Sequence, residues 1–146
     1  IAGPVEVSTA RDRLLGFQDG MKKACLEPVG IWYGNFTFES GYQLMQEILR
    51  SHEVDAVMAA NDLMAIGVIR ALQDNGIKVF EAVGVAGFDN VPLLSLAYPK
   101  LASARIPFFE MGTEAFVLLM SEQERSKSSN IVVKTEVVVP NTMVRR

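Results

Sequence analysis

Cysteine and histidine are nearly absent from this chain, which contains one of each, Cys25 and His52. A single cysteine excludes a disulfide within the chain and a metal site built from several cysteines, and it fits a reducing compartment such as the cytoplasm. A Ser-His-Asp or Cys-His catalytic arrangement would have to use His52, which lies in the polar turn Ser51-His52-Glu53. We therefore expect a protein that is not an enzyme and that holds no metal.

Long apolar runs and an excess of basic charge are also missing. No run approaches the roughly 20 apolar residues that cross a membrane, and the opening stretch does not have the pattern of a signal peptide. The 14 Lys and Arg residues against 17 Asp and Glu residues leave a net charge of -3, which disfavours direct contact with DNA phosphates. The glycine motifs G-x-G-x-x-G and G-x-x-x-x-G-K-[ST] are absent, so we expect no nucleotide cofactor.

The composition of the 146 residues, with 49% apolar and 21% charged, is typical of one folded domain. The chain opens with Ile1-Ala2-Gly3-Pro4, a sequence typical of the end of a strand that runs into a turn. We expect it to be a piece of a longer protein.

Hydrophobic periodicity and turn residues predict alternating helices and strands. Helices are expected at residues 10–25, after Thr37, from Asn61-Asp62 to Asn75-Gly76, and at 109–121. The first of them should begin with a Thr9–Asp12 capping box and end with Cys25 in the core. Strands are expected at 30–34, 54–60, 83–87, 102–106 and 131–139, with a polar loop at 122–130. This alternation predicts an α/β fold, a doubly wound parallel sheet with helices on both faces.

Polar and aromatic residues follow three of the predicted strands. They are the pairs Asn35-Phe36, Asn61-Asp62 and Asp89-Asn90. Ligands of doubly wound sheets bind beyond the carboxyl ends of the strands, so these side chains are candidates for small-molecule recognition. Arg11 and Arg13 in the first turn of the first helix carry positive charges near the positive end of the helix dipole, so we expect a carboxylate or a polar ligand as a compensating partner.

Each candidate also has an ordinary structural explanation. Asp62 fits the N-cap of a helix, Asn61 and Asp89 fit turns, Phe36 fits a core, and Arg13 fits a solvated surface. Their convergence on one edge of the sheet favours a binding site.

Five motifs occur along the chain in a characteristic order. They are Ser8-x-x-Arg11-x-Arg13-x-x-Gly16-Phe17, Gly34-Asn35-Phe36-Thr37-x-x-Ser40-Gly41-Tyr42, Ala59-Ala60-Asn61-Asp62-x-Met64-Ala65-x-Gly67, Gly87-Phe88-Asp89-Asn90 and Thr135-Glu136-Val137-Val138-Val139. The set covers nearly the whole chain and resembles the effector-binding domain of the LacI/GalR family of bacterial transcription regulators.

The resemblance implies a two-lobed core similar to periplasmic sugar-binding proteins, preceded by a DNA-binding helix-turn-helix that this chain does not contain. Residues 1–104 would form most of the C-terminal lobe. Residues 105–130 would be a crossover and a helix of the N-terminal lobe, and residues 131–146 a closing strand and tail. The implied partners are a small-molecule effector, in particular a carbohydrate, DNA through the missing helix-turn-helix, and a second copy of the protein.

The resemblance also implies roles for five residues. Arg13 resembles the arginine that hydrogen-bonds the effector, Phe36 the aromatic residue that stacks on it, and Phe108 an aromatic residue supplied by the crossover. Asn61 and Asp89 resemble the polar groups that hold sugar hydroxyls or base edges. Ile106 stands where the family commonly has a polar residue just before the last aromatic, so the identity of the effector is not carried over.

Two other classes of protein share this fold. A periplasmic solute-binding protein of a transporter has much of the same Asn-Asp and Gly-Phe-Asp pattern, and an upstream signal peptide instead of a helix-turn-helix would identify it. An enzyme on a flavodoxin-like sheet would need a nucleophile or a cofactor motif, neither of which the sequence shows.

Residues 63–72 are apolar almost all round, whereas a helix that covers a sheet needs one apolar stripe. We therefore expect the outer side of this helix, with residues 93–96, to contact a second subunit in a homodimer.

Overall fold

The computed structural model describes residues 1–120 and 131–139, which form five helices and four strands. In chain order these are α1 (Ser8–Lys23), α2 (Phe38–Ser51), β1 (Ala56–Met58), α3 (Asp62–Asp74), β2 (Gly84–Asp89), the short 3₁₀ helix η1 (Pro92–Ser95), β3 (Ala102–Arg105), α4 (Phe108–Met120) and β4 (Glu136–Val138). The predicted loop at 122–130 lies outside the described residues.

The sheet has the order β1-β2-β3-β4. The first three strands are parallel, with Val57 opposite Val85 and Gly87 opposite Ser103. The fourth strand runs antiparallel to β3, so the expectation of a wholly parallel sheet is wrong at this edge. Within the apolar run at 131–139, only Glu136–Val138 pair with β3, which is itself only four residues long.

The predicted strand at 30–34 is reduced to a bridge between Tyr33 and Ala2. The backbone nitrogen of Ala2 donates to the Trp32 carbonyl at 2.7 Å, and that of Gly34 donates to the Ala2 carbonyl at 2.8 Å. On the other side, the Ala60 nitrogen donates to the Ile1 carbonyl at 2.9 Å. The first two residues therefore extend the sheet beyond β1, as expected from the strand-like opening of the chain.

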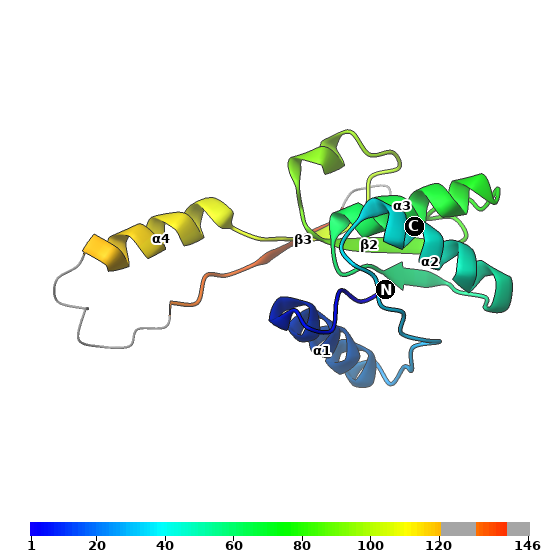
Figure 1. Ribbon diagram of the computed structural model, residues 1–146, viewed down its shortest axis with the longest axis horizontal. Helices are drawn as coiled ribbons and strands as arrows, with labels where there is room; N and C mark the ends of the chain where they lie inside the picture. Colours follow the sequence, from blue (N-terminus) through cyan, green and yellow to red (C-terminus); the bar gives the residue numbers. More distant parts are fainter. Residues whose placement is uncertain (121–130, 140–146) are drawn as a thin grey trace.

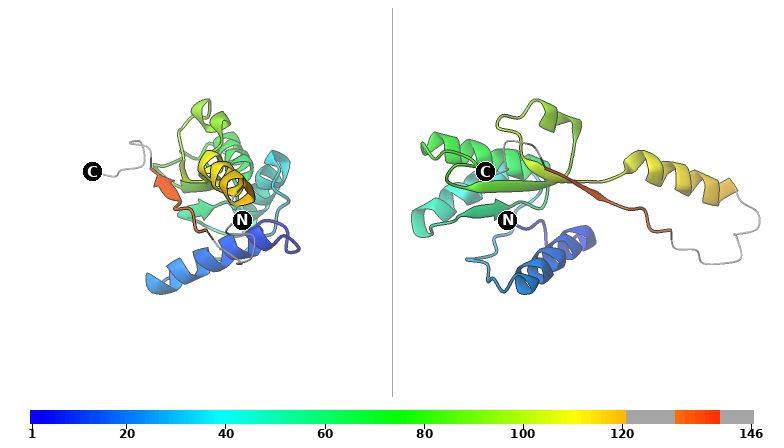
Figure 2. Two further views of the ribbon diagram at one scale, coloured as in Figure 1. Left: turned by 90° about the vertical axis from the view of Figure 1, so that its left-hand side faces the viewer. Right: turned by 180° about the vertical axis from the view of Figure 1, so that it is seen from behind.

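Helices cover both faces of the sheet, as predicted (Figures 1 and 2). α1 lies on one face, while α3, with α2 beside it, lies on the other. The core includes Met45 and Ile48 of α2, Met64 and Val68 of α3, and Val85 of β2.

The helix ends show which local signals operate. α1 begins at Ser8 after Val7, which makes no side-chain cap bond, so the predicted Thr9–Asp12 capping box is wrong. Thr37 caps α2 as predicted, since its hydroxyl accepts from the Ser40 nitrogen at 3.1 Å. α1 ends at Lys23, and Cys25 is exposed with a left-handed backbone (φ 56°), so its predicted place in the core is also wrong.

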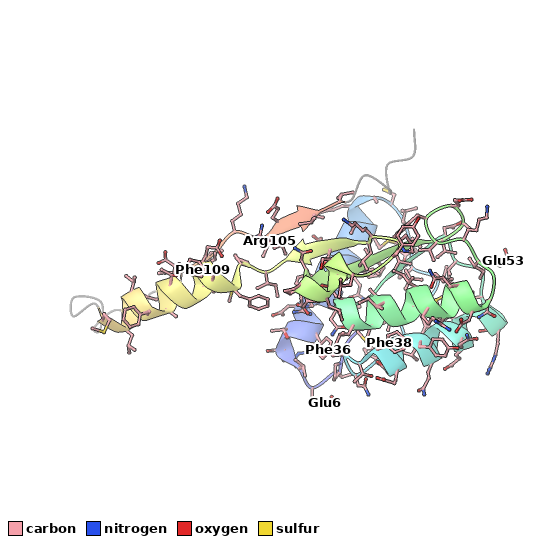
Figure 3. All side chains as sticks on the ribbon, turned by 90° about the horizontal axis from the view of Figure 1, so that it is seen from above. Glu6, Phe36, Phe38, Glu53, Arg105 and Phe109 are labelled. Carbon is pink, nitrogen blue, oxygen red and sulfur yellow. The ribbon has the colours of Figure 1, made fainter. Side chains whose placement is uncertain are left out.

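α4 lies apart from the rest of the molecule (Figure 1). None of its residues is buried, and Phe109, near its start, is 83% exposed. Figure 3 shows Arg105 at the end of β3 and Phe109 beyond it on this outlying helix. In the part of the chain that the structure describes, no helix is long and apolar enough to cross a membrane.

Candidate functional site

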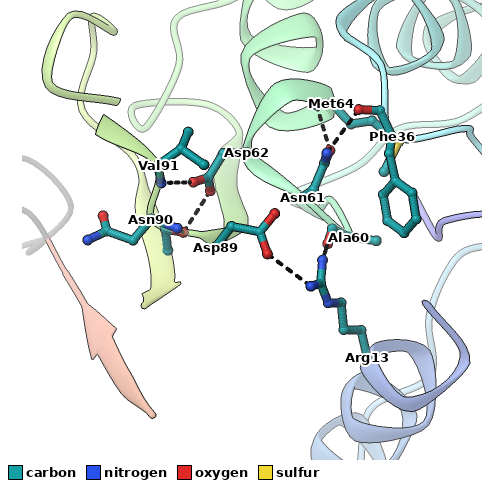
Figure 4. Close-up of polar contacts among 10 residues, drawn as sticks. Arg13, Phe36, Ala60, Asn61, Asp62, Met64, Asp89, Asn90 and Val91 are labelled. Carbon is teal, nitrogen blue, oxygen red and sulfur yellow. Dashed lines mark hydrogen bonds and ion pairs between the residues drawn. The ribbon is translucent and has the colours of Figure 1, made fainter. Parts of the chain in front are cut away.

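The carboxyl ends of β1 and β2 lie at the same edge of the sheet because the two strands are parallel neighbours. The chain leaves β1 through Ala59 and Ala60 to reach Asn61, and it leaves β2 at Asp89. The structure thus brings Asn61 and Asp89 to one edge, next to α1 (Figure 4).

Arg13 joins α1 to this edge. Its Nη1 donates to the Ala60 carbonyl at 2.6 Å, and its Nη2 pairs with Asp89 Oδ1 at 2.9 Å. The two side chains are only 15% and 20% exposed, so the ion pair is partly shielded from water. Asp89 is therefore the carboxylate partner that the charge of Arg13 leads one to expect, whereas Arg11 is exposed.

Two phenylalanine rings face the Arg13 guanidinium. Its Cζ lies 4.2 Å from the centre of the Phe88 ring and 5.9 Å from that of Phe36, which suits cation–π attraction. Sequence reasoning missed Phe88. Strand alternation is the signal that finds it, because the buried Val85 and Gly87 mark one face of β2 and place Phe88 on the other, toward α1.

Asn61 makes two hydrogen bonds within the chain. Its Oδ1 accepts from the Met64 nitrogen at 2.9 Å, so Asn61, not Asp62, is the N-cap of α3. Its Nδ2 donates to the Phe36 carbonyl at 2.9 Å. Phe36 has a left-handed backbone (φ 67°), so the amide of Asn61 fixes the loop that presents the Phe36 ring.

Asp62 follows Asn61 as the first residue of α3 and is 1% exposed. Its Oδ1 accepts from Ser103 Oγ at 2.6 Å and its Oδ2 accepts from the Val91 nitrogen at 2.8 Å. Burial raises the pKa of the Asp62 carboxyl, and these hydrogen bonds oppose the rise. Burial likewise raises the pKa of Asp89, while the charge of Arg13 lowers it.

Phe108 does not join the other four predicted site residues. It is the first residue of α4 and is 62% exposed. The backbone just before Phe108 does contact the site, because the Ile106 nitrogen donates to the Asp89 carbonyl at 3.4 Å. Ile106 precedes Phe108 by two residues, so Phe108 follows the strand that flanks Asp89.

Two cavities open on the described part of the chain, and only the first of them reaches a candidate site residue. One, of about 450 Å³, is mostly apolar, lies between α1 and the sheet, and has Arg13 among its lining residues with Leu14, Phe17 and Trp32. The other, of about 510 Å³, is a surface groove lined by Phe38, Tyr42, Ile66, Ile69, Arg70, Gln73, Asp74, Ala97 and Tyr98. Within residues 1–120 and 131–139, no group of three His, Cys, Asp or Glu side chains is arranged to hold a metal.

The mostly parallel sheet between two helical layers, with a polar cluster at the strand ends, is the architecture of a periplasmic-binding-protein-like domain. The sequence profile of the periplasmic binding protein-like domain matches residues 1–146, and the chain belongs to that family.

Its curated relatives include transcription regulators. The chain is 36% identical over 143 residues to the HTH-type transcriptional repressor PurR of Salmonella typhi, covering 94% of this chain and 42% of that protein. It is 35% identical over 144 residues to the HTH-type transcriptional regulator CelR of Thermobifida fusca, covering 95% and 42%. The chain thus spans less than half the length of these relatives.

Solved structures give the same relationship. The lac repressor dimer bound to operator and the anti-inducer ONPF superposes with a TM-score of 0.90 at 28% identity, over 99% of this chain and 44% of that one. A complex of the transcriptional regulator CelR with cellobiose superposes with a TM-score of 0.84 at 33% identity, over 95% and 44%.

Proposed function

We propose that this chain is the effector-binding part of a LacI-type transcription regulator and that its effector is a small neutral metabolite, in particular a sugar. The observation that carries the proposal is the partly buried Arg13–Asp89 pair, faced by two aromatic rings at the carboxyl ends of parallel strands. The similarity to PurR and CelR supports a regulator over a transporter's solute-binding protein.

The chemistry of the cluster suits a polyhydroxylated ring. Asp89 can accept hydrogen bonds from two adjacent hydroxyl groups while Arg13 donates to a third oxygen. The rings of Phe36 and Phe88 can pack on the apolar face of a sugar. Asn61 would contribute the N–H and the oxygen lone pair of its amide that its two bonds within the chain leave over. Phe108 would add an aromatic surface from the crossover. We expect no cofactor in this binding.

In such a regulator the effector controls operator binding by a helix-turn-helix outside these 146 residues, and the protein works in the cytoplasm. We also assign the groove beside α3 to a homodimer contact. The reason differs from the one that the sequence suggested, because Ile69 is buried (4% exposed) and α2 covers much of α3. Exposed apolar side chains remain in this region, namely Leu96 at 81% and Tyr98 at 85%, with Leu93 at 47% and Leu63 of α3 at 39%.

The test is an NMR titration of the isotope-labelled chain with cellobiose, glucose, galactose and a purine base at millimolar concentrations. We expect one saccharide to shift the Arg13 side-chain signals and the Phe88 and Asp89 amide signals together, and the Asp89→Ala variant to lose these shifts. A response to the purine base alone would replace the sugar with a heterocycle. No response to any of the four would contradict the assignment of this cluster.

A further inference from the structure

A buried carboxylate and a buried hydroxyl hold the loop that follows β2. Asp62 accepts from Ser103 Oγ at 2.6 Å and from the Val91 nitrogen at 2.8 Å. Ser103 Oγ in turn accepts from the Asn90 nitrogen at 3.0 Å. Asp62 and Ser103 are 1% and 2% exposed, so both hydrogen-bond inside the protein rather than with water. Figure 4 shows Asp62 with its bond to Val91.

These bonds stabilise an uncommon backbone shape. Asp89 and Asn90 both have positive φ, at 103° and 53°, which residues other than glycine seldom adopt. The two positive φ values in succession turn the chain at the end of β2, and in this conformation the Asp89 carboxylate meets Arg13 at 2.9 Å. The two backbone nitrogens that follow Asp89 are the ones bound by Ser103 and Asp62.

The alternative role of Asp62, that of a helix cap, is already filled. Asn61 caps α3 through its bond with the Met64 nitrogen, and both oxygens of Asp62 are directed to β3 and to the loop after β2. β2 is also built around this carboxylate, because a Cβ atom on Gly87 would clash with Asp62 Oδ1. The carboxylate therefore joins three elements next to the candidate site.

We propose that Asp62, with Ser103, is a positioning residue that fixes the left-handed Asp89-Asn90 turn and thereby orients Asp89 toward Arg13. Its importance for ligand binding rests on the proposed function of the Arg13–Asp89 cluster. Asp62 itself touches no ligand. Its effect passes through the two backbone nitrogens and the turn that they hold.

The first experiment measures amide hydrogen exchange by NMR in the 146-residue chain without ligand. Asp62→Ala should accelerate exchange at both Asn90 and Val91 by about tenfold beyond any change in global stability. Val91 loses its hydrogen bond to Asp62, and Asn90 bonds to a Ser103 hydroxyl that Asp62 no longer holds. Ser103→Ala should accelerate Asn90 and leave Val91 protected by Asp62. Asp74→Asn, at the far end of α3, is the matched control and should leave both amides unchanged.

The second experiment separates positioning from general stabilisation. The coupling between Arg13 and Asp89 is measured by a double-mutant cycle of Arg13→Ala and Asp89→Ala in chemical denaturation, once with Asp62 intact and once in the Asp62→Ala background. Positioning predicts that most of the coupling is lost without Asp62. A merely structural Asp62 would lower the stability of every variant alike and leave the coupling intact.

Preserved coupling in Asp62→Ala, or unchanged exchange at Asn90 and Val91, would overturn the proposal. Should Asp62→Ala fail to fold, Ser103→Ala carries the same test, and Asp62→Asn, which keeps the shape and one acceptor oxygen, should restore Val91 protection. These readouts need no ligand. If they change as expected while no saccharide binds, the positioning role stands and the proposed function fails. If a saccharide binds wild type while exchange and coupling stay unchanged in Asp62→Ala, the proposed function stands and the positioning role fails.

Discussion

Asp89 combines an unusual backbone with an ion pair, and both properties belong to a single residue. Its φ of 103° places it in a region that an alanine or leucine rarely occupies, and its carboxylate is paired with Arg13. A strained residue at a strand end is a common feature of functional sites, where the surrounding structure holds it in place.

Asp89→Ala should therefore weaken saccharide binding by about 1.5–3 kcal/mol, the range for a hydrogen bond to a charged group. The affinity is measured by calorimetry or by NMR titration with the saccharide that binds wild type. Asp74→Ala, which removes an exposed carboxylate paired with Arg70 on α3, should leave the affinity unchanged. Equal affinity in a folded Asp89→Ala chain would remove Asp89 from the site.

The two aspartates of α3 should respond to pH with opposite signs. Burial raises the pKa of Asp62 above its ordinary value of 3.8, helped by the nearby Asp89 charge, so folding favours its protonated form. The stability that this gives is complete below pH 3.8 and is lost as the pH rises through the higher folded-state pKa. Asp62→Asn cannot ionise, so wild type should lose stability relative to this variant as the pH rises from 3.8.

Asp74 provides the opposite case, because the hydrogen bond from Arg70 lowers its pKa. Wild type should gain stability relative to Asp74→Asn as the pH rises toward 3.8. Denaturant unfolding of the three proteins between acid and neutral pH measures both trends. A constant difference between wild type and Asp62→Asn across this range would contradict the raised pKa.

At the scale of elements, α2 and α3 are held together by glycines. A Cβ on Gly41 would clash with the backbone of Met64, and a Cβ on Gly67 would clash with the Phe38 carbonyl. The backbones of α2 and α3 are therefore in direct contact at Gly41 and Gly67. This contact explains why α3 is buried on nearly all sides.

Gly41→Ala and Gly67→Ala should each destabilise the chain by about 1–3 kcal/mol, because an added methyl group must push one helix away from the other. Gly20 in α1 has open space where a Cβ would stand, so Gly20→Ala is the control and should stabilise by about 0.5–1 kcal/mol through helix propensity. Thermal and denaturant unfolding measure all three. A neutral Gly41→Ala would mean that the helices separate at little cost.

Local sequence signals predicted most of the helices and strands but few of the contacts between them. The apolar run before Asn61 and the Asn75-Gly76 stop located β1 and α3, because such signals act within a few residues. The all-round apolar surface of α3 was assigned to a second subunit, whereas α2 provides much of the cover, and the contact depends on glycines far apart in the sequence. The antiparallel direction of β4 likewise depends on where the chain returns after α4.

The candidate site was predicted to a similar degree. The strand-end rule found Phe36, Asn61 and Asp89, since strand ends can be located from local patterns. Arg13 was found by its positive charge near the start of a helix. The structure brings these four residues together. The strand-end rule did not find Ser103, which contacts Asp62 across 41 residues. Nor did it distinguish Asn61 from Asp62 as the cap, because the two neighbouring side chains differ only in where the folded chain directs them.

At the scale of the whole molecule, many apolar side chains are exposed among the described residues, and two groups of them lie on separate surfaces. One includes Leu96 and Tyr98 beside the groove of α3, and the other includes Phe109 and Phe116 on α4. Exposed apolar patches of this kind are typical of contacts with other protein surfaces. The two surfaces can be distinguished by placing a charge on each.

Sedimentation should show the chain as a dimer whose association is weakened by Leu96→Asp, since a charge would have to be buried at the contact. Leu15→Asp, on the exposed side of α1, is the matched control and should leave association unchanged. A dimer that is insensitive to Leu96→Asp but lost in Phe109→Asp would assign the contact to α4. A monomeric wild type would argue against the groove as a subunit contact.

The pairing of Arg13 with Asp89 also has a consequence for which solutes the site admits. One positive and one negative side chain already neutralise each other there, with the Asp62 carboxyl below them, so no net positive charge is left over for an anion. A sugar phosphate would bring two extra negative charges toward two acidic groups and a single guanidinium, whereas an uncharged sugar brings none. The affinity for a neutral sugar should hardly change between low and high ionic strength, because an uncharged ligand has no long-range Coulomb interaction for salt to screen. Selection by charge is thus present in the protein before it meets a ligand.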